Sequence, residues 1–98
     1  MAVKVFIKRR FKAGGLKDGC QLITEARYNA MKQAGYISSE TLSDIEDPNR
    51  VVVISMWHSL ENWDRWKNSG VRIQIEAEIE KLLDTPTAYE KYNLGVQL

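Results

Sequence analysis

Three tryptophans fall within the ten-residue stretch WHSLENWDRW, and this 98-residue chain has no others. They are Trp57, Trp63 and Trp66, and the last two are three residues apart, which places them on the same side of a helix. Such a cluster suits the wall of a pocket for a flat apolar ligand. It equally suits a core that packs a helix onto a sheet, because a fully buried aromatic side chain contributes roughly 1.5–3 kcal/mol. The sequence leaves both interpretations open.

Few polar groups are available to act beside these rings. Arg9, Tyr36 and Tyr92 fall on predicted strands and are the candidates for a polar lining. Tyr89 is a further strand tyrosine, and the sequence leaves open which of the three tyrosines point inward. His58, the single histidine, follows a strand and precedes a helix, which favours an exposed loop position over a general base. Cys20 falls on the apolar stripe of a predicted helix, where a cysteine is more often a small hydrophobic residue than a nucleophile. We therefore assign no catalytic residue from the sequence.

Sequence signals for metals, nucleotides and nucleic acids are absent or weak. No CxxC, HExxH, P-loop or GxGxxG motif occurs, so we expect no metal site and no bound cofactor. The densest basic run is KRRFK, residues 8–12. RNA-binding domains of similar topology need exposed aromatic residues on their first and third strands, and the third strand here is aliphatic. We expect the run to be a charged strand end facing water, without a nucleic-acid partner.

Composition and charge are those of one ordinary globular domain spanning residues 1–98. Apolar residues make up 44% of the chain, charged residues 28%, and the formal net charge is +1. This balance favours neither nucleic acid nor a strongly basic partner. A single cysteine rules out an internal disulfide and fits a reducing cytoplasm. The N-terminal apolar run is too short for a signal peptide, and we expect no contact with a membrane.

Periodicity in the first half of the chain predicts a strand, a helix and a second strand. Residues 2–11 alternate as a strand with one buried face, which Arg9 interrupts. Residues 16–34 follow a helical period that stops at Gly35. A polar strand, YISSETLS, follows at residues 36–43. The buried stripe of the helix is expected to consist of Leu16, Cys20, Ile23, Ala26, Ala30, Met31 and Ala34.

The second half predicts a central strand, an interrupted helix and a last strand. RVVVISMW, residues 50–57, is apolar on both faces, which is typical of a strand covered on both sides. Ser59 is a suitable helix N-cap, and the helix runs to about Ser69, where Gly70 interrupts it. TAYEKYNL, residues 87–94, forms the final strand. The helix is expected to resume along Val71, Ile75, Ile79 and Leu82.

The resulting order, β-α-β-β-α-β, predicts a ferredoxin-like α+β fold. In this fold a four-stranded antiparallel sheet carries its helices on one face. The doubly apolar strand 50–57 then leaves an apolar surface on the other face, and a second copy of the chain is the simplest cover for it. We expect a homodimer that packs sheet face to sheet face as a dimeric α+β barrel.

The stretch DPNRVVVISMWHSLENWDRWKNSGVR resembles the signature region of the antibiotic biosynthesis monooxygenase family, within the dimeric α+β barrel superfamily. That family shows an acidic or Pro-Asn turn, an apolar strand ending in Trp, a Ser-x-Glu helix start and a small-residue break. GYISSETL and PTAYEKYNL are similar to two further strands of the family. The resemblance therefore covers nearly the whole chain.

One branch of the family degrades haem, and the resemblance implies where its residues would fall. That branch uses an Asn on the first strand, a Trp on the second helix and a haem-ligating His further along the helix. The corresponding positions are near Arg9, at Trp66 and at Glu76. A carboxylate is a poor substitute for a neutral imidazole as a haem ligand. We therefore expect no haem degradation.

Another branch oxidises polycyclic phenols without a cofactor. It uses an Asn within the third strand, a Trp at the end of that strand and a Tyr early in the next helix, positions that fall on Val53, Trp57 and Trp63. The resemblance implies a cofactor-independent monooxygenase acting on a small aromatic or quinone-like molecule. Because the polar residue is lost, a non-catalytic dimeric protein that binds a ligand or serves a structural role stays open. The candidate pocket residues are Trp57, Trp63, Trp66, Tyr36, Tyr92 and Arg9.

Overall fold

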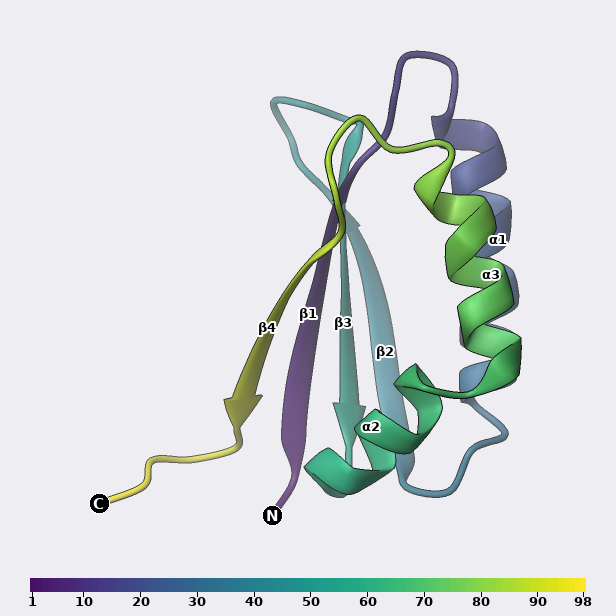
Figure 1. The fold of residues 1–98 in the computed structure, drawn as a ribbon. Coiled ribbons are helices and arrows are strands. Elements are labelled where there is room, and N and C mark those ends of the chain that lie inside the picture. The colour runs from purple at the N-terminus through teal and green to yellow at the C-terminus, as the bar shows by residue number, and fades with distance from the viewer.

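A computed structural model describes residues 1–98 of the chain. Its strands form one antiparallel sheet in the order β2-β3-β1-β4. Figure 1 shows every helix on one side of this sheet and none on the other. The predicted ferredoxin-like α+β fold is thus confirmed. The elements are β1 (Val3–Arg10), α1 (Leu16–Ala30), β2 (Tyr36–Ser43), β3 (Arg50–Trp57), α2 (Leu60–Lys67), α3 (Gly70–Glu80) and β4 (Ala88–Asn93).

Strand β1 buries one face, as its alternation predicts, with one correction at Arg9. This arginine was expected to interrupt the buried face, yet it continues that face and is only 6% exposed. Successive side chains of a strand point to opposite sides, so the position and not the residue type decides the direction. The run KRRFK is therefore not wholly a solvated strand end, because its second residue lies inside the protein.

Helix α1 is shorter than its periodicity predicts, and its buried stripe is different. The helix ends at Ala30, and the chain turns through Gly35, whose φ is +83°. Cys20, Met31 and Ala34 are exposed, so their assignment to the buried stripe was wrong. The inward position belongs to Gly19, where an added Cβ would lie 2.1 Å from Cε1 of Phe11. The helix therefore approaches the sheet around the Phe11 ring, which turns its neighbour Cys20 outward.

The break predicted at Gly70 separates two helices, each with its own serine N-cap. Ser59 Oγ accepts the backbone N–H of Asn62 at the start of α2. Ser69 Oγ accepts the backbone N–H of Arg72 at the start of α3. The expected seam of α3 is corrected at its first residue, because Val71 is 49% exposed and Arg72 points inward in its place. The new helix start changes the direction of the axis and with it the buried face.

The hydrophobic core lies between the sheet and the helices. Strand β3 contributes Val51, Val53 and Trp57 to it, as predicted. On the other face of β3 the apolar side chains are only half-buried, so the open side of the sheet is itself apolar. None of the helices combines the length and apolar composition needed to cross a membrane. The core residues from the helices and the last loop are Ile23, Ala30, Trp63, Trp66, Ile75, Ile79 and Leu83.

The contact between Gly19 and Phe11 is testable by adding one methyl group. Gly19→Ala should lower the free energy of unfolding by about 1–3 kcal/mol, because the Phe11 ring must move out of a packed core. Gly70→Ala is the matched control, since no atom lies within 4 Å of its added Cβ. It should be neutral or stabilising by up to about 1 kcal/mol. Denaturant melts that rank the two variants equally would contradict this packing.

Candidate functional site

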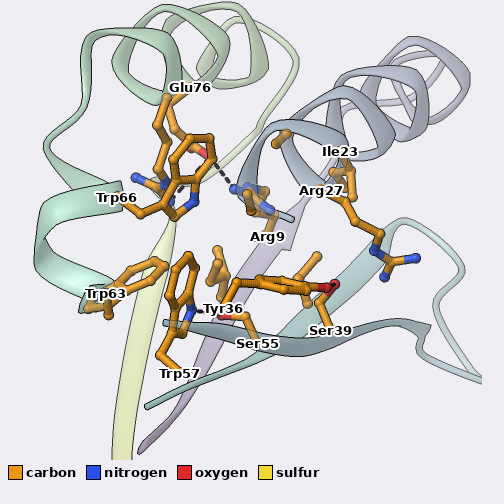
Figure 2. Close-up of a pocket in the computed structure, with 15 residues that line it drawn as sticks. Arg9, Ile23, Arg27, Tyr36, Ser39, Ser55, Trp57, Trp63, Trp66 and Glu76 are labelled. Atoms are coloured by element: carbon orange, nitrogen blue, oxygen red, sulfur yellow. Dashed lines mark hydrogen bonds and ion pairs between the residues drawn. The ribbon is translucent and has the colours of Figure 1, made fainter. Parts of the chain in front are cut away.

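A small cavity lies between the inner face of the sheet and the three helices (Figure 2). Its volume is about 40 Å³. A buried water needs about 10–15 Å³, so the cavity has room for a few waters. One end of the cavity is charged, and the remainder is mainly aromatic and aliphatic, with Arg27, Ser39 and Ser55 also in its lining. Its aliphatic lining consists of Ile7, Ile23, Ala26, Ala30 and Val53.

The aromatic wall is formed by the three tryptophans together with Tyr36. All three indoles are buried and all line the cavity. Trp57 meets both Tyr36 and Trp63 edge to face, with centroid separations of 5.5 Å and 6.2 Å. The Trp57 indole N–H donates to Ser55 Oγ at 3.1 Å, so its one polar atom is satisfied inside the core. The tryptophans are thus core residues and cavity-lining residues at once, which joins the two interpretations that the sequence left open.

The charged end of the cavity is an ion cluster of Arg9, Arg72 and Glu76. Arg9 Nη2 donates to Glu76 Oε1, a contact drawn in Figure 2, and Arg72 Nη2 lies 3.3 Å from the same oxygen. Arg72 also donates to the Tyr89 hydroxyl at 3.0 Å. Its guanidinium lies over the Trp63 ring, 5.1 Å from the centroid. The cluster therefore connects β1, α3 and β4 to the aromatic wall.

The ion cluster holds two positive charges against one negative charge in a buried place. Burial lowers the pKa of Arg9 from its usual value, and the nearby Glu76 carboxylate opposes that effect. An arginine nevertheless stays protonated in proteins, so the excess positive charge persists. Arg9 Nε and Glu76 Oε2 are buried and have no hydrogen-bond partner. Since buried polar atoms are nearly always paired, these two mark a place where a ligand could complete the structure.

The structure brings together all the predicted site residues except Tyr92. Arg9 and Tyr36 line the cavity with the tryptophans. Tyr92 is 53% exposed and packs edge to face against Phe6, on the open face of the sheet. Its placement at the pocket was therefore wrong. Tyr89, three residues earlier on the same strand, faces inward instead, because an odd separation along a strand reverses the direction of the side chain.

Two members of the ion cluster were not identified as site residues from the sequence. Arg72 and Glu76 are four residues apart on α3, a spacing that favours an ion pair on one helix face. That spacing was the available signal, but it usually indicates a solvated helix face. Their approach to Arg9 depends on a contact across 67 positions of the chain, which no local pattern contains.

The remaining chemistry-bearing residues lie away from the cavity. His58 and Cys20 are exposed. In the basic run, Lys8 pairs with Glu90 at 3.1 Å, and Arg10 is exposed and pairs with two aspartates. No group of three or more His, Cys, Asp or Glu residues lies close enough together to hold a metal ion. The cavity with its ion cluster is therefore the candidate functional site.

Several solved structures share this fold at low sequence identity. A conserved protein from Methanosarcina mazei is 20% identical with a TM-score of 0.89, over 94% of this chain and 91% of that one. Rv0793 from Mycobacterium tuberculosis is 14% identical with a TM-score of 0.89, over 99% and 98%. SnoaB, described as a cofactor-independent oxygenase from Streptomyces nogalater, is 13% identical with a TM-score of 0.84, over 100% and 98%. Identities this low show a common fold and nothing further.

The family of the chain is shown by a match to a family model. A search among curated proteins found no match. The model for "Antibiotic biosynthesis monooxygenase" matches residues 2–78, which include β1, most of α3 and the whole ion cluster. The resemblance inferred from the sequence is thereby confirmed. From its fold, its aromatic strand end and this match, the chain belongs to the antibiotic biosynthesis monooxygenase family.

Proposed function

We propose that this protein is a cofactor-independent monooxygenase that oxidises a small aromatic or quinone-like molecule in the cavity between sheet and helices. The observation that carries the proposal is a cavity whose lining brings the three buried tryptophans together with the guanidinium groups of Arg9 and Arg72. Membership of the family supports it, as does the shared fold with SnoaB. A cytoplasmic location, expected from the single free cysteine, is part of the same proposal.

The reaction needs no redox group if the substrate supplies the electrons. A phenol such as 1-naphthol and one O₂ give 1,4-naphthoquinone and one water. One oxygen atom enters a ring carbon that loses its hydrogen, the other leaves as water, and the ring provides all four electrons. The protein's part is to exclude water and to stabilise the phenolate that first gives up an electron. Buried guanidinium groups suit that second task because they donate hydrogen bonds and stay charged.

A bound ring requires the cavity to open. Ligand pockets usually measure about 300–1,000 Å³, far more than the roughly 40 Å³ present here. Tyr36 and Arg27 lie on the side of the cavity formed by β2 and α1, and both are half-buried. Each side chain makes one hydrogen bond, Tyr36 with Ser39 at 2.7 Å and Arg27 with Thr41 at 2.7 Å. Rotation of these two side chains is the entry route that we propose.

A second candidate is a dimeric protein of the same fold that binds a ligand or serves a structural role without catalysis. Val53 favours this alternative, because it stands where the phenol-oxidising branch resembled by the sequence has an Asn. Its side chain lines the cavity and cannot donate a hydrogen bond. The buried state of every tryptophan also fits a purely structural role. Oxygen consumption separates the two candidates.

Ligand binding and turnover can be measured directly. 1,4-Naphthoquinone should quench tryptophan fluorescence saturably, and 1-naphthol should consume oxygen with no added flavin or metal. Trp66→Phe should weaken binding severalfold, because it removes part of the wall. It should also cost about 1–3 kcal/mol of stability, less than the roughly 3–5 kcal/mol of a Trp→Ala change. Tyr92→Phe, away from the cavity, should change neither.

Heat-denatured protein controls for autoxidation of the naphthol. Saturable quenching without oxygen uptake would favour the non-catalytic alternative. A loss of stability in Trp66→Phe with no saturable quenching by the naphthoquinone in the unaltered protein would reject the ligand-binding cavity itself.

Haem should not be degraded. Glu76 occupies the position of the ligating His in the haem branch, and its Oε1 is already engaged by Arg9 and Arg72. The cavity is also much too small for a porphyrin. When haem is titrated into the protein in the presence of a reductant, the Soret band should show no stoichiometric shift and should not disappear. Stoichiometric binding followed by loss of the band and release of iron would show this expectation to be wrong.

We propose that two copies pack through their open sheet faces. The half-buried residues Val52, Ile54 and Met56 of β3 lie there beside the Phe6–Tyr92 pair. Ile54→Glu should shift the protein from dimer to monomer in sedimentation equilibrium at micromolar concentration, because it places a charge in this apolar face. Ile73→Glu, an equal change at an exposed site on α3, should stay dimeric. A monomeric unaltered protein would contradict the proposal.

A further inference from the structure

We propose that the cavity takes its ligand as an anion: an aromatic molecule with an ionised oxygen that accepts a hydrogen bond from Arg9 Nε. This inference rests on the proposed function and names the substrate class of the same cavity. A phenolate-type oxygen and a carboxylate share the required chemistry.

The charges that line the cavity are mainly positive. They belong to Arg9, Arg27, Arg72 and Glu76, three positive charges against one negative charge. Arg27 directs Nη2 outward to the exposed Thr41. The excess positive charge inside the cavity therefore comes from Arg9 and Arg72, which face the single negative charge of Glu76. A buried charge without a counterion is strongly unfavourable. An anionic ligand would supply that counterion, and a neutral ligand would not.

The unpartnered atoms indicate where the ionised oxygen binds. Arg9 Nε and Arg27 Nε are buried donors without an acceptor. Glu76 Oε2 is the one buried acceptor without a donor, and it repels a negative oxygen. An ionised oxygen is therefore favoured only on the guanidinium side of the cavity. A buried guanidinium attracts the full negative charge of an ionised oxygen but only the lone pair of its neutral analogue, so this site discriminates between the two.

The apolar wall explains why the anion is attached to a ring. The Arg72 guanidinium lies over the Trp63 ring, so positive charge and aromatic surface are adjacent in the cavity. Figure 2 shows Arg9 close to Trp66, with Trp57 and Tyr36 forming the opposite side. A ring held between these side chains would direct a substituent toward the ion cluster. A small inorganic anion would leave the apolar wall unused.

Matched pairs of ligands test the inference in the unaltered protein. 2-Hydroxy-1,4-naphthoquinone is a vinylogous acid that is ionised at neutral pH, and 2-methoxy-1,4-naphthoquinone is its neutral match. 2-Naphthoate and 2-naphthamide form the corresponding carboxylate pair. Isothermal titration calorimetry should give at least about tenfold tighter binding for one or both anions than for their neutral matches. The pair with the larger affinity ratio shows whether the cavity prefers a phenolate-type oxygen or a carboxylate as the anionic group of its ligand.

Two variants on neighbouring residues of β1 assign the preference to the cavity. Arg9→Gln should abolish the tenfold ratio while changing the affinity for the methoxy compound by less than about threefold. Arg10→Gln removes the same charge from an exposed position and should keep the ratio. Arg9→Lys keeps the charge but loses the Nε donor, so it should give an intermediate ratio. Thermal melts of each variant establish that it is folded.

The outcomes distinguish this inference from the proposed function. Equal affinities within both pairs would overturn the anion site and leave an aromatic cavity standing. Absence of binding by all four compounds would overturn both proposals. Retention of the ratio in folded Arg9→Gln would show that the anion binds elsewhere. If Arg9→Gln does not fold, the ratio in the unaltered protein still tests the preference for an anion, and Arg9→Lys tests its place in the cavity.

Discussion

The structure depends on one buried contact, between Arg9 of β1 and Glu76 of α3. Strand alternation places a guanidinium on the inner face of the sheet, where an unpaired charge is strongly unfavourable. The partner on α3 therefore restricts how that helix rotates and where it lies against the sheet. That rotation also turns Arg72 inward onto Trp63 and Tyr89. A single ion pair thus positions the helix and forms the charged end of the cavity.

The same residues stabilise the fold and shape the candidate site. Trp57 and Trp63 are almost completely buried and pack edge to face, which uses their large apolar surface for stability. Their rigid rings nevertheless leave a small space beside Arg9 that the neighbouring aliphatic side chains do not fill. Packing and ligand binding are therefore not competing explanations of the tryptophan-rich stretch. In this chain the core packing and the cavity lining meet at the junction of strand β3 and helix α2.

Local patterns predicted the elements well and the site only in part. β2 and β3 begin and end at the predicted residues, because alternation and strong turn residues act locally. The assignments of Cys20 and Val71 failed because each depends on how a helix meets a distant ring or a new helix start. The placement of Tyr92 in the pocket failed because two tyrosines three residues apart, Tyr89 and Tyr92, must face opposite sides of a strand. The ion cluster could not be predicted, since Arg9 and Glu76 meet only in the folded chain.

A crystal structure with 2-hydroxy-1,4-naphthoquinone tests the account most directly. The ring should lie between Trp66 on one side and Trp57 and Tyr36 on the other, with an ionised oxygen about 2.7–2.9 Å from Arg9 Nε, as in other charge-assisted hydrogen bonds. The Tyr36 and Arg27 side chains should have rotated away from Ser39 and Thr41. A ligand bound on the open sheet face, or one that enters the cavity with its ionised oxygen turned away from the arginines, would contradict the account.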